Sequence, residues 1–218
     1  MVRLPLATDW AEVLVPPVWS ATLLLIILVL AWALRRPLTR AFAALGVSRL
    51  SILGVDVEWI TNQAEDAYSA RNLPAPGRGE LRAFALLGVR LEPLIRDRRI
   101  LWVDDNPANN ETEAMLLRKL GVEVENATGT EEAVTRLRRD PTRFDLVISD
   151  WTRGGNRDAG PELLTELGLA GIGLPVLMYV EDTSAERKAR VAELGAKGIT
   201  AEPDELLKQV LVELATAG

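Results

Sequence analysis

The chain has 218 residues and a net charge of −6 at pH 7, and it contains neither cysteine nor histidine. This length allows one globular domain of ordinary size together with something smaller. The acidic balance gives no general electrostatic reason to expect nucleic-acid binding, and the missing residue types exclude thiol nucleophiles, imidazole bases and the usual zinc ligands.

Residues 18–34 carry no charge and consist mainly of Leu, Ile, Val and Ala. Together with the apolar run at residues 13–15, they approach the roughly 20 apolar residues that cross hydrocarbon. Tryptophans fall near both ends of the segment, where indole rings favour the membrane interface: Trp10, Trp19 and Trp32. Arginines follow it, at positions 35, 36 and 40. The pattern predicts one transmembrane helix with the carboxyl-terminal bulk in the cytoplasm.

This segment has two other interpretations, a cleaved signal peptide and a buried core helix. The small-x-small pattern at residues 31–33 would suit a cleaved signal peptide, but the first 17 residues lack a basic n-region. A buried core helix is the other interpretation, and the richness of the segment in Leu and Ile with no charge on any face argues against it. We therefore expect residues 1–37 to be a short tail and a single membrane span, with the bacterial inner membrane as the expected location.

Residues 38–98 form a connector with mixed signals. Strict alternation at residues 55–59 predicts a short strand. A polar helix is predicted at residues 60–72 and is closed by the Pro- and Gly-rich loop at 74–79. A second helix is predicted at residues 81–95, kinked or split by Pro93. The connector is either a juxtamembrane spacer, which is the favoured interpretation, or a helical pair that dimerises and carries signal.

Residues 99–218 alternate between short apolar runs and helical segments, which predicts an α/β domain with a parallel sheet. Strands are predicted at residues 100–103, 122–126, 146–149, 175–180 and 198–200. Helices are predicted at residues 110–120, 130–139, 161–167, 184–194 and 204–215. Such alternation implies right-handed crossovers with helices on both faces of the sheet.

Three aspartates follow two of these strands. Asp104 and Asp105 come directly after the first strand, and Asp150 comes directly after the third. Because the functional crevice of such sheets lies at the carboxyl ends of the strands, we expect one site for a hard cation or for a phosphoryl-accepting aspartate. The alternative is that these acids cap the following helices, as Asp105 could do ahead of Pro107.

Residues 99 to about 215 resemble the receiver domain of response regulators, the phosphoacceptor module of two-component signalling. The matching segments are Ile-Leu-Trp-Val-Asp-Asp (100–105), Phe-Asp-Leu-Val-Ile-Ser-Asp (144–150), Gly-Pro-Glu-Leu-Leu (160–164), Pro-Val-Leu-Met (175–178), Gly-Ala (195–196) and Pro203. The resemblance implies a flavodoxin-like, doubly wound, five-stranded parallel sheet of order 2-1-3-4-5. It also implies that Asp150 accepts phosphate, while Asp104, Asp105 and the backbone carbonyl of Thr152 help to hold Mg²⁺.

Two positions depart from the family pattern. Where the family has Ser or Thr at the end of the fourth strand, this chain has Val180, which can donate no hydrogen bond. Where the family has Lys before the proline that follows the fifth strand, this chain has Glu202. We expect Glu202 to add an anion facing the acidic cluster, where the original cation would have stabilised the phosphoryl group.

Nearby residues could compensate for these losses. Thr183 and Ser184 lie a few residues past Val180 and could fold back towards the acids. Arg153 and Arg157, in a loop about two residues longer than usual, could contact an anion, although solvated loop charges are the commoner case. The preceding tryptophan, at position 151, is either a packing residue or part of a recognition surface.

The favoured hypothesis is a membrane-anchored, receiver-like signalling module, not an enzyme, that acts through protein contacts, with phosphorylation at Asp150 impaired or lost. Its alternative is a working Mg²⁺-dependent phosphoacceptor. A Mg²⁺-dependent phosphohydrolase is a remote third hypothesis, since Asp104-Asp105 lacks the Asp-x-Asp spacing of such enzymes. Expected partners are the membrane and a protein, either a histidine kinase or a neighbouring effector, with no nucleic acid. Self-association is left open.

Overall fold

In a computed structural model, the described part of the chain comprises residues 51–52 and 55–217. The predicted membrane segment at residues 18–34 lies outside these residues. Within the described part, no helix combines the length and the apolar character needed to cross a bilayer.

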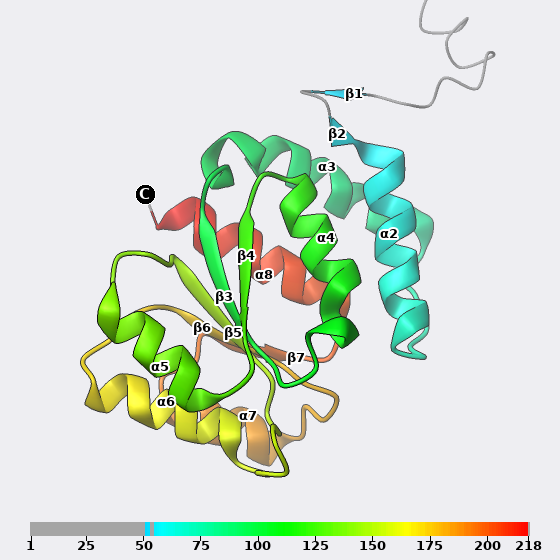
Figure 1. The fold of residues 1–218 in the computed structure, drawn as a ribbon. Helices are drawn as coiled ribbons and strands as arrows, with labels where there is room; N and C mark the ends of the chain where they lie inside the picture. The colour runs from blue at the N-terminus through cyan, green and yellow to red at the C-terminus, as the bar shows by residue number, and fades with distance from the viewer. Residues whose placement is uncertain (1–50, 53–54, 218) are drawn as a thin grey trace, which may run out of the picture. The chain divides into compact units, whose positions relative to one another are not determined.

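A sheet of five parallel strands forms the centre of the fold (Figure 1). The strands are β3 (Arg99–Val103), β4 (Glu123–Ala127), β5 (Leu146–Ser149), β6 (Val176–Tyr179) and β7 (Gly198–Thr200). Their order across the sheet is β4-β3-β5-β6-β7, which is 2-1-3-4-5 counted from β3. The predicted flavodoxin-like α/β sheet is therefore confirmed, and the ends of β3 and β5 lie side by side because Val103 pairs with Ser149.

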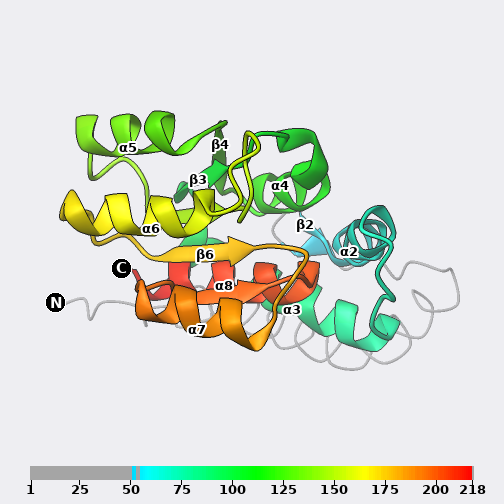
Figure 2. The same ribbon diagram turned by 90° about the horizontal axis from the view of Figure 1, so that it is seen from below.

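Helices cover both faces of this sheet because successive strand residues point to opposite sides. The helices are η1 (Pro107–Asn110), α4 (Glu111–Lys119), α5 (Thr130–Arg139), α6 (Ala159–Leu169), α7 (Ala185–Glu193) and α8 (Pro203–Thr216). In β3, Leu101 and Val103 pack in the core beneath α5, α6 and α7, whereas Ile100 and Trp102 pack in the core beneath α4 and α8. Helix α6 lies between α5 and α7 (Figure 2).

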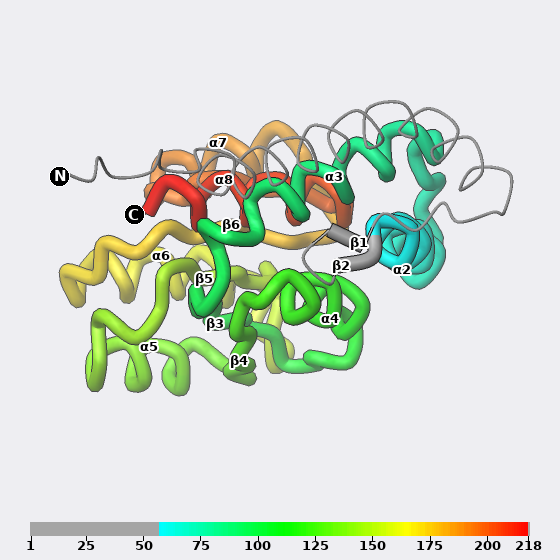
Figure 3. Tube along the Cα trace, turned by 90° about the horizontal axis from the view of Figure 1, so that it is seen from above, coloured from blue at the N-terminus to red at the C-terminus, as the bar shows by residue number. Residues whose placement is uncertain are grey.

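Two further helices form an additional layer over α4 and α8. A two-stranded antiparallel pair, β1 (Ser51–Ile52) and β2 (Val55–Asp56), precedes α2 (Val57–Ala70) and α3 (Arg78–Ile95). Helix α2 lies beside α4, and α3 lies beside α8 (Figure 3). We call residues 57–95 the amino-terminal hairpin. Its buried Ile60 and Phe84 share one apolar core with Leu116 of α4 and Leu211 of α8.

The structure corrects the connector in three respects. Only residues 55–56 of the predicted strand at 55–59 are extended, because buried Val57, Ile60 and Ala64 have helical spacing and pack as one face of α2. Pro93 does not split the second helix. Its side chain is exposed in the last turn of α3, and the helix continues to the buried Ile95. From residue 57 onward the connector is a packed layer of the domain and does not form a loose spacer.

Candidate functional site

The three predicted acids line one cleft at the carboxyl ends of β3, β5 and β6. The cleft has a volume of about 410 Å³ and is lined by Asp104, Asp105, Asp150 and Thr152, with Val180 at its wall. We call it the acidic cleft. The parallel register that aligns the ends of β3 and β5 is what brings these distant positions together.

Two of the acids are held by hydrogen bonds from the chain itself. The buried Asp104 accepts the backbone N–H of Asn106 on Oδ1, at 2.7 Å, and the side-chain amide of Asn110 on Oδ2, at 2.6 Å. The exposed Asp105 accepts the backbone N–H of Gly154 on Oδ2, at 2.7 Å. Asp105 therefore reaches across to the loop after β5, and no side chain caps η1.

The third acid, Asp150, is half-buried and has a shifted pKa. Burial raises the pKa of Asp150 above its ordinary value, and the neighbouring charge of Asp104 raises it further. Hydrogen bonds from the backbone of Trp151 and Thr152, together with the charge of Arg153, act in the opposite direction but do not cancel the effect. The ionised form of Asp150 therefore destabilises the folded protein at neutral pH.

Replacement of Asp150 by asparagine is expected to raise the melting temperature at pH 7. Because the pKa of Asp150 is raised on folding, stability falls as pH rises from the unfolded-state pKa, near 4, through the folded-state pKa. The gain of Asp150→Asn should therefore shrink towards zero at about pH 3, where both forms carry no charge at this position. Thermal melts across this range, with exposed Asp66→Asn as control, test the expectation. A gain of equal size at both pH values would contradict it.

The donors in the cleft suit a hard cation of the kind that the receiver resemblance implies. Mg²⁺ binds in proteins through one or two carboxylates, with carbonyl oxygens and water completing its shell. Among the described residues, no group of three or more acidic side chains is placed to hold one metal ion. An ion held by one or two of these aspartates and the Thr152 carbonyl fits the residues that line the cleft. Such an ion would neutralise the charge of an incoming oxyanion.

Arg153 is not the solvated loop charge that sequence reasoning favoured. It is only 4 % exposed, and the adjacent Gly154 and Gly155 adopt positive φ values of 57° and 78°. Its guanidinium donates hydrogen bonds to Ser149 Oγ at 2.6 Å, Ala159 O at 2.7 Å, Thr130 Oγ1 at 3.0 Å and the backbone oxygen of Asp150. Burial lowers the pKa of Arg153, and the negative charges of Asp150 and Asp104 partly offset this shift. Arg157 remains exposed.

Trp151 is a packing residue. It is buried, and the guanidinium carbon of Arg187 lies 4.5 Å from its ring centroid, with that of Arg190 at 6.0 Å. Together with Val180 it belongs to the apolar core beneath α5, α6 and α7. The recognition-surface interpretation of Trp151 is therefore wrong in this structure.

The two positions that depart from the family pattern behave differently. Val180 lines the cleft but is 1 % exposed and packed in the core. Glu202 is exposed, lies just before α8, and is not among the residues that line the cleft, whereas we expected it to face the acids. Thr183 does not line the cleft either, and the hydroxyl of Ser184 caps α7 by accepting the backbone N–H of Arg187.

Sequence reasoning missed both arginines that line the cleft, Arg71 and Arg187. Arg71, from the turn that ends α2, lines the cleft together with the acids. No local motif marks it, because its position depends on the packing of the amino-terminal hairpin against α4. The only available signal was the apolar face of α2, which indicates that the helix packs but not on what.

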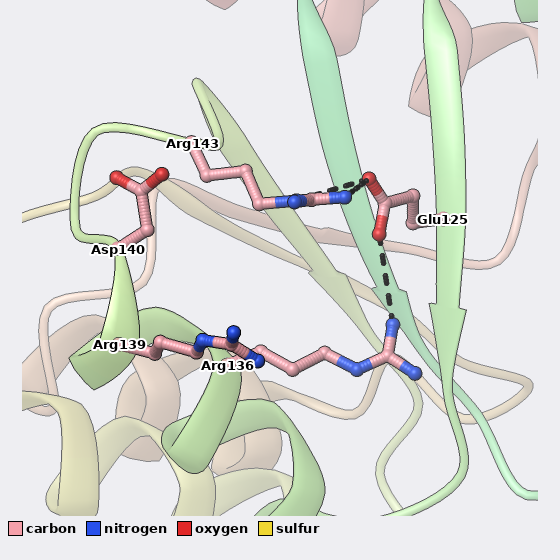
Figure 4. Close-up of a pocket in the computed structure, with 5 residues that line it drawn as sticks. All are labelled: Glu125, Arg136, Arg139, Asp140 and Arg143. Atoms are coloured by element: carbon pink, nitrogen blue, oxygen red, sulfur yellow. Dashed lines mark hydrogen bonds and ion pairs between the residues drawn. The ribbon is translucent and has the colours of Figure 1, made fainter.

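A second cleft lies between β4 and the end of α5 (Figure 4). Its volume is about 630 Å³, and its lining residues are Glu125, Arg136, Arg139, Asp140 and Arg143. Glu125 lies 2.7 Å from Nη2 of Arg143 and 3.7 Å from Nη1 of Arg136. Two of its three arginines, Arg136 and Arg143, already face this carboxylate, and we assign the cleft no role.

A doubly wound parallel sheet with acids gathered after its first and third strands defines a signalling domain of the receiver class. Comparison with known families agrees: the model of the response regulator receiver domain matches residues 100–211, just over half of the chain. The chain belongs to this family.

Named relatives and a solved structure support the assignment. The two-component response regulator ARR2 of Arabidopsis thaliana is 32% identical over 141 residues, 64% of this chain and 20% of its own length. The methanol utilization control regulatory protein MoxX of Paracoccus denitrificans is 31% identical over 105 residues, 48% of this chain and 46% of its own length. The receiver domain of Francisella response regulator 1452 shares the fold, with a TM-score of 0.50 and 22% identity, covering 56% of this chain and all of that one. The chain thus spans less than half of either curated relative.

Proposed function

We propose that this protein is a membrane-anchored signalling module of the receiver family that acts through protein contacts, and that phosphorylation at Asp150 is impaired. Val180 carries this proposal. It occupies the position where the family has a hydroxyl that binds the phosphoryl group, and its side chain is buried in the core. An aliphatic side chain donates nothing to an oxyanion, and moving it towards the cleft would expose apolar surface.

The second departure weakens the same step. A phosphoryl group on Asp150 gains from a cation placed close to its oxygens. Glu202 supplies none, and it lies outside the cleft. The phosphorylated state is therefore less stabilised than in a receiver that keeps both residues.

A working Mg²⁺-dependent phosphoacceptor is the second candidate. The presence of Asp104, Asp105 and Asp150 in one cleft favours it, as does the cation Arg71 beside them. No observation favours the phosphohydrolase, and we propose no enzymatic activity.

The test compares phosphorylation of four proteins by acetyl phosphate with Mg²⁺, on gels that retard phosphoproteins. We expect the wild type to show little modification, Asp150→Ala none, and the double variant Val180→Thr/Glu202→Lys several-fold more than the wild type. The triple variant that also carries Asp150→Ala provides the control. Near-complete, Asp150-dependent modification of the wild type would contradict the proposal, as would a double variant that gains nothing.

Membrane anchoring rests on the sequence pattern at residues 18–34. We expect the full chain to remain in the membrane pellet after carbonate extraction, with the receiver domain on the cytoplasmic side, and a chain that begins at Val57 to stay in the supernatant. Full-length protein in the supernatant would overturn the anchoring. The partner in this scheme is a protein, either a histidine kinase or an effector, which accords with the regulatory names of the two curated relatives.

A further inference from the structure

Arg71 is the basic residue that the amino-terminal hairpin brings to the acidic cleft. Its backbone N–H donates to Tyr68 O at 3.2 Å in the turn that ends α2, and the next residue, Asn72, has a φ of 55°. The chain therefore turns sharply away at this point, while the Arg71 side chain lines the cleft together with Asp104 and Asp150. A cation from outside the five-stranded sheet thus faces its acids.

The guanidinium of Arg71 is fixed in place by three neighbours. Its central carbon lies 3.6 Å from the ring centroid of Tyr179, the residue directly before Val180. Its Nη2 donates a hydrogen bond to Asn110 Oδ1 at 3.2 Å. Its Nε lies 3.6 Å from Oε1 of Glu113, which is too far for a hydrogen bond. A guanidinium held in this way is oriented before any ligand arrives.

Donors of Arg71 remain unused. The side chain is only 17% exposed, and its buried Nε donates no hydrogen bond. Within the described residues, Nη1 donates none either. The adjacent acid, Glu113, is itself buried, accepts the hydroxyl of Tyr179 at 2.6 Å, and has a pKa raised by that burial. Buried N–H groups without acceptors are costly, so an oxyanion in the cleft would be favoured.

Neither of the two other arginines near the acids is as well placed. Arg187 also lines the cleft, but it pairs with Asp182 at 3.3 Å and stacks over the ring of Trp151. Arg153 donates from Nη1 to Ser149 Oγ and from Nη2 to Ala159 O. Its buried Nε has no acceptor among the described residues, but Arg153 is not among the residues that line the cleft. Of the two arginines that line the cleft, Arg71 is therefore the one with a buried donor that has no acceptor among the described residues.

We propose that Arg71 supplies the positive charge that contacts an oxyanion held at Asp150, and that it thereby couples the cleft to the amino-terminal hairpin. The inference rests on the proposed receiver function, and it identifies a contact that the receiver sheet itself does not supply. The side chain of Asn110 makes the coupling direct, because its amide nitrogen donates to Asp104 while its oxygen accepts from Arg71. A change of charge at the acids thus reaches α2 through one amide.

The test uses two probes with the full chain in detergent: Mg²⁺ alone, and beryllofluoride, a phosphoryl mimic, at saturating Mg²⁺. Binding is followed by calorimetry in the wild type, Arg71→Gln, Arg71→Lys and the control Arg78→Gln. Arg78 lies on the same hairpin, pairs with Glu65 and is not among the residues that line the cleft. We expect Arg71→Gln to weaken beryllofluoride binding by roughly tenfold or more. Mg²⁺ affinity should stay equal or rise, because a like charge has gone.

Opposite responses to the two probes separate a ligand contact from structural damage. Arg71→Lys should keep part of the beryllofluoride affinity, and Arg78→Gln should match the wild type. Unchanged beryllofluoride affinity in Arg71→Gln would overturn the inference, and so would a parallel loss of both affinities. A wild type that binds no beryllofluoride would also overturn it while agreeing with impaired phosphorylation, so the two proposals can fail separately.

Discussion

A chain that begins at Arg98 is expected to be less stable than one that begins at Val57 by roughly 5 kcal/mol or more. Removing the amino-terminal hairpin exposes the outer faces of α4 and α8, including Leu116 and Leu211, which are fully buried against it. Burial of each large apolar side chain contributes roughly 1.5–3 kcal/mol, and several are lost from both sides of this contact. Such a loss approaches the whole stability of an ordinary domain.

Urea denaturation of the two truncated chains measures this difference, with two point variants as a finer probe. Phe84→Ala should cost about 3–5 kcal/mol, since Phe84 is buried between the layers. The matched control Leu86→Ala, at a side chain 46% exposed on the same helix, should cost far less. Equal midpoints for the chains beginning at Arg98 and Val57 would show that the hairpin is not part of the folding unit.

Replacement of Arg153 by methionine is expected to destabilise the protein by about 3 kcal/mol or more. Methionine fills a similar volume but leaves Ser149 and Thr130 and the backbone oxygens of Asp150 and Ala159 without the guanidinium as a donor. The oxygen of Asp150 keeps the Ser149 hydroxyl as a donor, and that of Ala159 keeps the Thr130 hydroxyl. The hydrogen bonds that are lost come from a charged group, and each such bond contributes roughly 1.5–3 kcal/mol. Relief from burying the charge offsets part of this cost, because burial lowers the pKa of Arg153.

Arg157→Met is the matched control, since Arg157 belongs to the same loop and is exposed. It should change the free energy of unfolding by no more than about 0.5 kcal/mol. Chemical denaturation of both variants at pH 7 decides the matter. If Arg153→Met were as stable as the control, the bonds of Arg153 would not be what holds this loop.

The sheet could be predicted from the sequence because its signals are local. Apolar runs such as residues 146–149 end in an acid or a turn, and the order of strands and helices fixed the α/β class. Asp104, Asp105 and Asp150 could be placed together because parallel strands end at one edge.

The two helices of the hairpin were predicted, but their packing on α4 and α8 and the position of Arg71 were not, since no short-range pattern shows which surface α2 covers. Strict alternation at residues 55–59 also mimicked a strand, and only packing against α4 selected the helix from Val57. The burial of Arg153 was missed for a similar reason. A charged residue in a glycine-rich loop is usually solvated, and it turns inward here because four acceptors converge on it.

The amino-terminal hairpin is part of the receiver, and Arg71 couples it to the acidic cleft. Hydrogen–deuterium exchange of the full chain, with and without Mg²⁺ and beryllofluoride, tests this coupling most directly. We expect slower exchange in α2 and the turn at Asn72 in the wild type, no such change in Arg71→Gln, and little change at residues 180–203. Slower exchange at residues 180–203 with α2 unaffected would contradict it.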